Sequence, residues 1–195
     1  MRAAVYGIML LVCAPVALGQ AIIGFAGGSQ YDSYYGSASG DVIGWRFTVN
    51  DDLYVTDLGV WNADQTGGIE SPHQVGIWDG SQNLVTSATV DAGGTVVGDW
   101  IYASVAPTSL FTGQTYTIGA LYFPGDSDYY ISSASSMTAA TEITWLSSVY
   151  PASSELGFVF PASTSTSIGR FGPNFLFGGY SLEQTTWGAI KATMQ

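Results

Sequence analysis

The chain has 195 residues, 47% of them hydrophobic and 10% charged, which predicts one domain with a buried core and excludes a wholly disordered chain. Its 6 Trp, 12 Tyr, 9 Phe and 25 Gly favour short aromatic strands and tight turns over charged helices. A formal net charge of −11 argues against nucleic acid and anionic membrane surfaces as partners.

Residues 1–20 have the pattern of a signal peptide. An early Arg2 precedes an apolar run over residues 3–12, Pro15 interrupts it, and small residues follow at cleavage spacing. We expect cleavage after Gly19 or Ala21 and a secreted or cell-surface protein. No later apolar run reaches the roughly 18 residues of a membrane span, so none is expected. The single cysteine, Cys13, lies in this leader, which leaves the mature chain without disulfides.

The next segment, residues 21–40, begins with an apolar pentad at residues 21–25 that predicts a short strand. The Gly-, Ser- and Tyr-rich stretch over residues 27–40 has neither the periodicity of a helix nor that of a strand, which predicts a flexible arm. A short uncharged strand must be paired, either within its own sandwich, which we favour, or on the edge of a neighbouring copy. Self-association by strand exchange is therefore an open alternative.

Residues 41–179 predict a β-sandwich domain. Ile43, Trp45, Phe47 and Val49 alternate with smaller or polar residues, and the turn at residues 50–52 predicts a hairpin with residues 53–55. Asp79 and Gly80 mark a second tight turn. Further strands are expected at residues 58–61, 74–78, 84–90, 97–105, 115–123, 143–149, 156–160 and 168–177. The fold class predicted is all-β, a jelly-roll-like antiparallel β-sandwich, with a short C-terminal helix in the tail over residues 180–195.

Five motifs resemble one family. They occupy residues 44–49, 58–61, 71–78, 113–116 and 171–175, in order, over most of the mature chain. The pattern is similar to the extracellular family called domain of unknown function 4082. The resemblance implies an exported bacterial jelly-roll-like sandwich, often found with a PEP-CTERM sorting tail or beside glycan-related modules, without an established activity. Because no Pro-Glu-Pro motif is present near Gln195, covalent sorting to the envelope is not expected.

Catalytic patterns are weak. The segment nearest to a serine-hydrolase elbow, residues 36–40, has Ala38 where the nucleophile should stand. His73 is the one histidine and is expected to fix a loop through hydrogen bonds rather than to act as a base. The carboxylates are scattered, and Asp126 with Asp128 is expected in a solvated turn. The prediction is a non-enzymatic protein.

The loop over residues 62–70 resembles the start of a calcium loop. Asn62, Asp64 and Thr66 place oxygen atoms at the first, third and fifth positions, and Gly67 stands at the sixth. His73 occupies the position of the bidentate glutamate, so Glu70 would have to supply that carboxylate. The sequence thus indicates a weak Ca²⁺ site, with a plain glycine-stabilised turn as the alternative.

Sugar rings stack on exposed aromatic side chains, so aromatic residues outside the core pattern are candidate ligands. Trp45 falls in the inward pattern of its strand, and so do Tyr116 and Tyr122. The candidates expected to be exposed at strand ends and loops are Trp61, Trp78, Trp100, Tyr129 and Tyr130, with His73 beside them. The sequence accordingly favours a secreted, non-catalytic module that binds extracellular polysaccharide or other surface proteins. A structural subunit of a surface layer or filament is the alternative, and a glycan-cleaving enzyme is the least favoured role.

Overall fold

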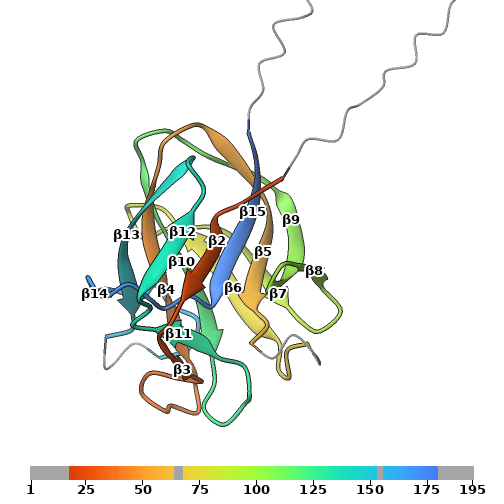
Figure 1. The fold of residues 1–195 in the computed structure, drawn as a ribbon, viewed down its shortest axis with the longest axis vertical. Helices are drawn as coiled ribbons and strands as arrows, with labels where there is room; N and C mark the ends of the chain where they lie inside the picture. The colour runs from red at the N-terminus through yellow and green to blue at the C-terminus, as the bar shows by residue number, and fades with distance from the viewer. Residues whose placement is uncertain (1–17, 64–67, 153–155, 180–195) are drawn as a thin grey trace, which may run out of the picture.

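The computed structural model describes residues 18–63, 68–152 and 156–179. In these ranges the protein is all-β, and two antiparallel sheets pack face to face (Figure 1). The prediction of an antiparallel β-sandwich is confirmed. The predicted C-terminal helix lies outside the described residues, and the described part holds no helix that could cross a membrane.

One sheet has five strands and the other has six. Across the first, the order is β1 (Gly19–Gln20), β15 (Pro173–Gly179), β5 (Leu53–Trp61), β9 (Trp100–Leu110) and β8 (Thr95–Val97). Across the second, it is β14 (Ser163–Ser165), β13 (Ile143–Tyr150), β4 (Asp41–Val49), β10 (Thr115–Tyr122), β6 (His73–Trp78) and β7 (Leu84–Val90). Two ribbons complete the fold: β2 (Ile22–Ala26) with β12 (Ser136–Ala139), and β3 (Ser29–Tyr31) with β11 (Tyr130–Ser132).

The alternating residues of β4 form the centre of the core, as their period of two predicts. Ile43, Trp45, Phe47 and Val49 are all fully buried. Phe175 of the opposite sheet lies against them, with its ring centroid 6.0 Å from that of Trp45 and 5.2 Å from that of Phe47. The indole Nε1 of Trp45 donates to the carbonyl of Pro173 at 2.9 Å, which gives this buried polar atom a partner across the two sheets.

The turn at Asp79 and Gly80 is the predicted hairpin between β6 and β7. The carboxylate of Asp79 accepts hydrogen bonds from the backbone of Ser81 and Asn83, which stabilises the turn. The hairpin predicted at residues 50–52 is wrong, because β4 and β5 lie in different sheets. The alternation of buried and exposed residues could not reveal this. Strands that face each other across a core each bury one face, as the two strands of a hairpin do, so both arrangements give the same sequence pattern.

The predicted strand at residues 156–160 is not a strand. Phe158 and Phe160 instead pack beside Trp78, next to Val42 and Leu121. The arm is more ordered than predicted, since residues 29–31 form β3. The apolar pentad pairs with β12 of its own chain, which is the intramolecular alternative favoured from the sequence. The first strand, β1, pairs with β15, so the folded body begins before residue 21.

Candidate functional site

A pocket lies where β3 and β11 meet the chain ahead of β15. Tyr130 stands opposite Tyr31 in this ribbon, with the two rings stacked at 6.0 Å. A bridge between Ile131 and Phe171 brings Arg170 to the same place. The cavity measures about 240 Å³. Its lining residues, called here the tyrosine–arginine pocket, are Tyr31, Ser33, Tyr34, Tyr130, Ser132 and Arg170.

Arg170 is the cation of this pocket and is only 9% exposed. Its guanidinium carbon lies 4.6 Å from the ring centroid of Tyr34, 4.7 Å from that of Tyr150 and 5.9 Å from that of Tyr130. Such contacts hold a guanidinium through the negative faces of the rings. Among the described residues no carboxylate forms an ion pair with it. Its Nε is buried without a hydrogen-bond partner, and one long contact of 3.5 Å joins its terminal nitrogen to the Tyr130 hydroxyl.

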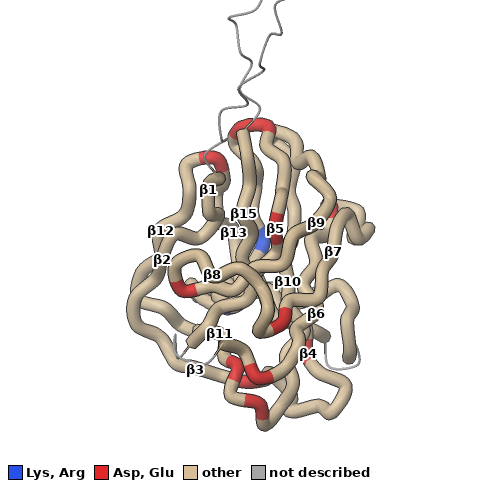
Figure 2. The backbone as a smooth tube through the Cα atoms, turned by 90° about the vertical axis from the view of Figure 1, so that its right-hand side faces the viewer, with Lys and Arg blue, Asp and Glu red and all other residues tan. Residues whose placement is uncertain are grey.

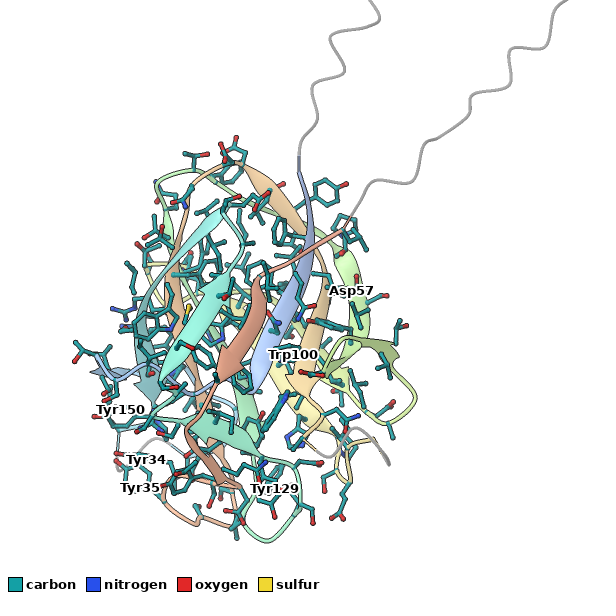
Figure 3. The ribbon with its side chains drawn as sticks, viewed as in Figure 1. Tyr34, Tyr35, Asp57, Trp100, Tyr129 and Tyr150 are labelled. Atoms are coloured by element: carbon teal, nitrogen blue, oxygen red, sulfur yellow. The ribbon has the colours of Figure 1, made fainter. Side chains whose placement is uncertain are left out.

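The mouth of the pocket is rich in exposed tyrosine. Tyr31 is 48% exposed and Tyr34 is 39% exposed. The backbone N–H groups of Tyr34 and Tyr35 both donate to Oδ2 of the buried Asp41, at 2.9 and 2.7 Å, which fixes this loop at the start of β4. Tyr34, Tyr35 and Tyr150 lie together at one end of the sandwich (Figure 3). Exposed aromatic faces therefore surround a cation that the fold holds in place.

The hydroxyl of Tyr130 stays protonated around neutral pH. Burial raises the pKa of Tyr130 to about 12, although the nearby positive charge of Arg170 acts in the opposite direction. The protonated hydroxyl donates to the carbonyl of Ser33 at 3.3 Å. This hydrogen bond joins two residues that line the pocket, and it keeps the loop before β4 against β11.

A second cluster, called here the acidic corner, consists of Glu70, His73, Asp126 and Asp128. His73 is fully buried at the start of β6, and its Nδ1 lies 2.7 Å from the carbonyl oxygen of Leu121. A carbonyl can only accept, so Nδ1 carries the proton. The other ring nitrogen, Nε2, lies 3.0 Å from Oδ2 of Asp128. The prediction that His73 fixes a loop agrees with these contacts.

Asp128 is 4% exposed, so the expectation of a solvated turn is wrong for it. Its carboxylate accepts from the backbone N–H groups of Glu70 and Ser71 at 2.9 Å, besides its contact with His73. Burial would raise the pKa of Asp128, but the hydrogen bonds from His73, Ser71 and Glu70 outweigh it and hold that pKa below its usual value. The carboxylate is therefore charged at neutral pH.

Asp126 has a different environment although it lies two residues away. Both of its carboxylate oxygens are buried without a hydrogen-bond partner. Burial raises the pKa of Asp126, and the charges of Asp128 and Asp32 raise it further, while His73 acts against them. A backbone N–H of Asp128 near the carboxylate also lowers this pKa, but the described residues give the two buried oxygens no hydrogen bond of good geometry. Acidic residues gather in the loops at this end of the sandwich (Figure 2).

Two of the predicted calcium ligands reach the acidic corner. Asn62 and Glu70 line a small cavity of about 20 Å³ together with Ser127 and Asp128. Asn62 is 6% exposed and its Oδ1 has no hydrogen-bond partner among the residues that the structure describes, whereas Glu70 is exposed and accepts from the N–H of Ser127 at 3.3 Å. Asp64 and Thr66 lie outside the described residues. Asn62 and Glu70 of the predicted loop therefore lie beside Asp128, which comes from a distant loop, and the Ca²⁺ site stays a prediction.

The tryptophans predicted as exposed ligands are buried: Trp61 is 8%, Trp78 is 4% and Trp100 is 2% exposed. Phe25 of β2 packs edge-on against Trp61 and Trp100, with centroids 5.3 and 5.9 Å away, and Figure 3 shows Trp100 among the core side chains. Phe158 covers Trp78 at 5.2 Å. Chain segments outside the main sheets cover these positions, which the alternation within a strand cannot show.

The two remaining aromatic candidates, Tyr130 and Tyr129, differ in their exposure. Tyr130 is buried at 1% exposure, yet its edge lines the pocket, and Tyr129 is half-buried beside it in sequence. The sequence reasoning missed Tyr31, Tyr34 and Arg170. The dense run of tyrosines at residues 31, 34 and 35 was a usable signal, but it was interpreted as part of a flexible arm. Nothing in the local sequence marked Arg170 as their partner.

Comparison with known proteins adds no relative: neither a scan against protein-family models nor a search of curated proteins gives a match.

Proposed function

We propose that this protein is a secreted, non-catalytic module that binds extracellular polysaccharide in the tyrosine–arginine pocket. The observation that carries the proposal is a buried guanidinium that has no carboxylate partner in the described part of the chain and that lines an open cavity rimmed by exposed tyrosines. A cavity of about 240 Å³ is smaller than the ~300 Å³ at the lower end for drug-sized ligands, so it suits a single sugar ring or a chain end.

The lining residues supply the chemistry that a sugar requires. Tyr31 and Tyr34 are 48% and 39% exposed, and the parts of their rings left open by Tyr130 and Arg170 can contact the C–H face of a pyranose ring. Ser33 and Ser132 offer hydroxyls to the ring hydroxyls. Arg170 adds N–H donors in a planar fork, a geometry that matches a carboxylate. Because this fork has no carboxylate among the described residues, the pocket favours a polysaccharide that contains uronic acid, and this local contact has to outweigh the repulsion between other anionic groups and the net charge of −11.

The experiment is retention of the mature protein in affinity electrophoresis through gels that contain a uronate-rich or a neutral polysaccharide. We expect selective retention by the uronate-rich chain, weakened about 10- to 100-fold in Arg170→Ala, because a charge-assisted contact to an anion contributes roughly 1.5–3 kcal/mol. Tyr34→Ala should weaken it less. Arg46→Ala is the matched control, since Arg46 is an arginine of β4 outside the pocket and should bind like the parent.

Equal retention of Arg170→Ala and the parent would contradict the assignment of this pocket. Retention that is lost in Arg46→Ala as well would point instead to a diffuse charge effect. A circular dichroism melt of each variant separates lost binding from lost folding, which matters because Arg170 also packs against three tyrosines.

Export is part of the proposal, and its support is the leader pattern at residues 1–20. We expect N-terminal sequencing of secreted material to begin between Gln20 and Ile22. Cleavage after Gly19 leaves Gln20 as the first residue, still placed to pair with Leu176 in the sheet. Secreted protein that begins at Met1 would contradict this expectation.

The alternative roles have less support in the contacts. Strand exchange between copies would have to break the pairing of β2 with β12. For glycan cleavage, two carboxylates should face a cleft, whereas Asp128 is buried and its oxygens accept backbone hydrogen bonds.

A further inference from the structure

We propose that His73, Asp126 and Asp128 bind a divalent ion of the first transition row, with Zn²⁺ as the probe. This site is separate from the tyrosine–arginine pocket and does not depend on the proposed function. One nitrogen or oxygen atom from each of the three residues lies within 4.8 Å of the others. The three come from the start of β6 and the loop that follows β10.

The protonation of His73 is the first argument. Its Nδ1 donates to the carbonyl of Leu121 at 2.7 Å, and a neutral imidazole then has its lone pair on Nε2. Metal-binding histidines commonly donate their other ring N–H to a backbone carbonyl in this way, which orients the ring. Nε2 faces Oδ2 of Asp128 at 3.0 Å, so positive charge is needed between them, either a second proton on the ring or a metal ion.

Geometry is compatible with a metal ion. Two ligand atoms that each lie about 2.1 Å from a tetrahedral Zn²⁺ ion are about 3.4 Å apart. Nε2 and Oδ2 are 3.0 Å apart, so a shift of about 0.4 Å would let both contact one ion. Ca²⁺ takes oxygen ligands, whereas an imidazole nitrogen with two carboxylates suits Zn²⁺ and its neighbours.

Asp126 distinguishes the two sources of positive charge. A second proton on His73 would pair with Asp128 and leave the buried oxygens of Asp126 still without a hydrogen-bond partner. A divalent ion bound between the three groups would instead give those oxygens a partner, since one ligand atom of each residue lies within 4.8 Å of the others. Glu70 and Asp32 stand nearby and add negative potential that attracts a cation.

The test is calorimetric titration of chelator-treated, dialysed protein with Zn²⁺ and with Ca²⁺, beside thermal melts with each ion. We expect one Zn²⁺ per chain, a Tm that rises with Zn²⁺ concentration, and affinity for Zn²⁺ above that for Ca²⁺. Asp126→Asn should weaken Zn²⁺ binding at least ~10-fold, because even the loss of a residue that only orients a metal ligand commonly costs that much. Because the described residues give the Asp126 side chain no hydrogen bond of good geometry and asparagine has nearly the same shape, this variant should fold and should melt no lower than the parent without metal.

Asp51→Asn is the matched control. Asp51 is an exposed acid in the turn that follows β4, and this turn lies at the opposite end of β4 from Asp41. It should bind Zn²⁺ like the parent. Nitrogen-15 spectra of the one imidazole add a readout independent of stability, since Nε2 should be unprotonated and shifted by Zn²⁺ while Nδ1 keeps its proton. Absent binding at millimolar Zn²⁺, equal binding by Asp126→Asn and the parent, or an Nε2 that stays protonated with Zn²⁺ present would each overturn the proposal.

Discussion

Replacement of Asn174 with alanine is expected to lower the free energy of unfolding by about 3 kcal/mol, because a buried backbone group left without its partner costs roughly 1–3 kcal/mol. Asn174 is fully buried on β15. Its Oδ1 accepts from the N–H groups of Ile22 at 2.9 Å and Phe175 at 3.0 Å, and its Nδ2 donates to the Ile22 carbonyl at 2.9 Å. One amide thus holds the N-terminal segment against the sandwich.

The measurement is urea unfolding at pH 7, followed by tryptophan fluorescence. Asn50→Ala is the matched control, since the exposed Asn50 also bonds backbone and side chain, to the carbonyl of Thr141 at 2.8 Å and the hydroxyl of Thr144 at 3.1 Å. Water replaces those partners on an exposed turn, so its loss should cost less than about 1 kcal/mol. Equal costs for the two variants would mean that the Asn174 contacts do not stabilise the fold.

Replacement of Asp128 with asparagine should cost about 3 kcal/mol at pH 7, because buried N–H groups that lose their acceptor cost roughly 1–3 kcal/mol each. The amide keeps the shape of the side chain but removes the charge that faces His73, and it loses acceptor capacity toward the N–H groups of Glu70 and Ser71. The measurement is again urea unfolding, with chelator present so that no metal ion contributes. Asp52→Asn is the control: its exposed carboxylate accepts from the N–H and hydroxyl of Thr112, and it should cost far less.

The pH dependence of this difference has a definite sign. The pKa of Asp128 is lower in the folded protein than its ordinary value, so the carboxylate contributes stability above the unfolded pKa of about 3.9. That contribution is lost as the pH falls through the folded pKa. The free-energy margin of the parent over Asp128→Asn should therefore shrink as the pH falls below about 3.9. A margin that does not shrink below about pH 3.9 would contradict the lowered pKa of Asp128.

The sequence by itself determined the fold class and the inward face of single strands. Ile43, Trp45, Phe47 and Val49 are buried because a period of two places them on one face, whatever strand lies beside them. The hairpin at Asp79 and Gly80 was predictable for a similar reason, since a tight turn is stabilised by bonds within a few residues. The role of His73 as an anchor followed from a lone histidine at the mouth of a strand.

Tertiary structure decided which surfaces are covered and which distant residues meet. Trp61, Trp78 and Trp100 look exposed along their own strands, but β2 and residues 156–160 cover them. Arg170 reaches Tyr34 across 136 positions of sequence because β3, β11 and the chain before β15 meet at one end. Asp128 likewise reaches His73 across 55 positions. A strand's alternation reports only its own two faces, whereas a site depends on contacts between strands, which no local pattern encodes.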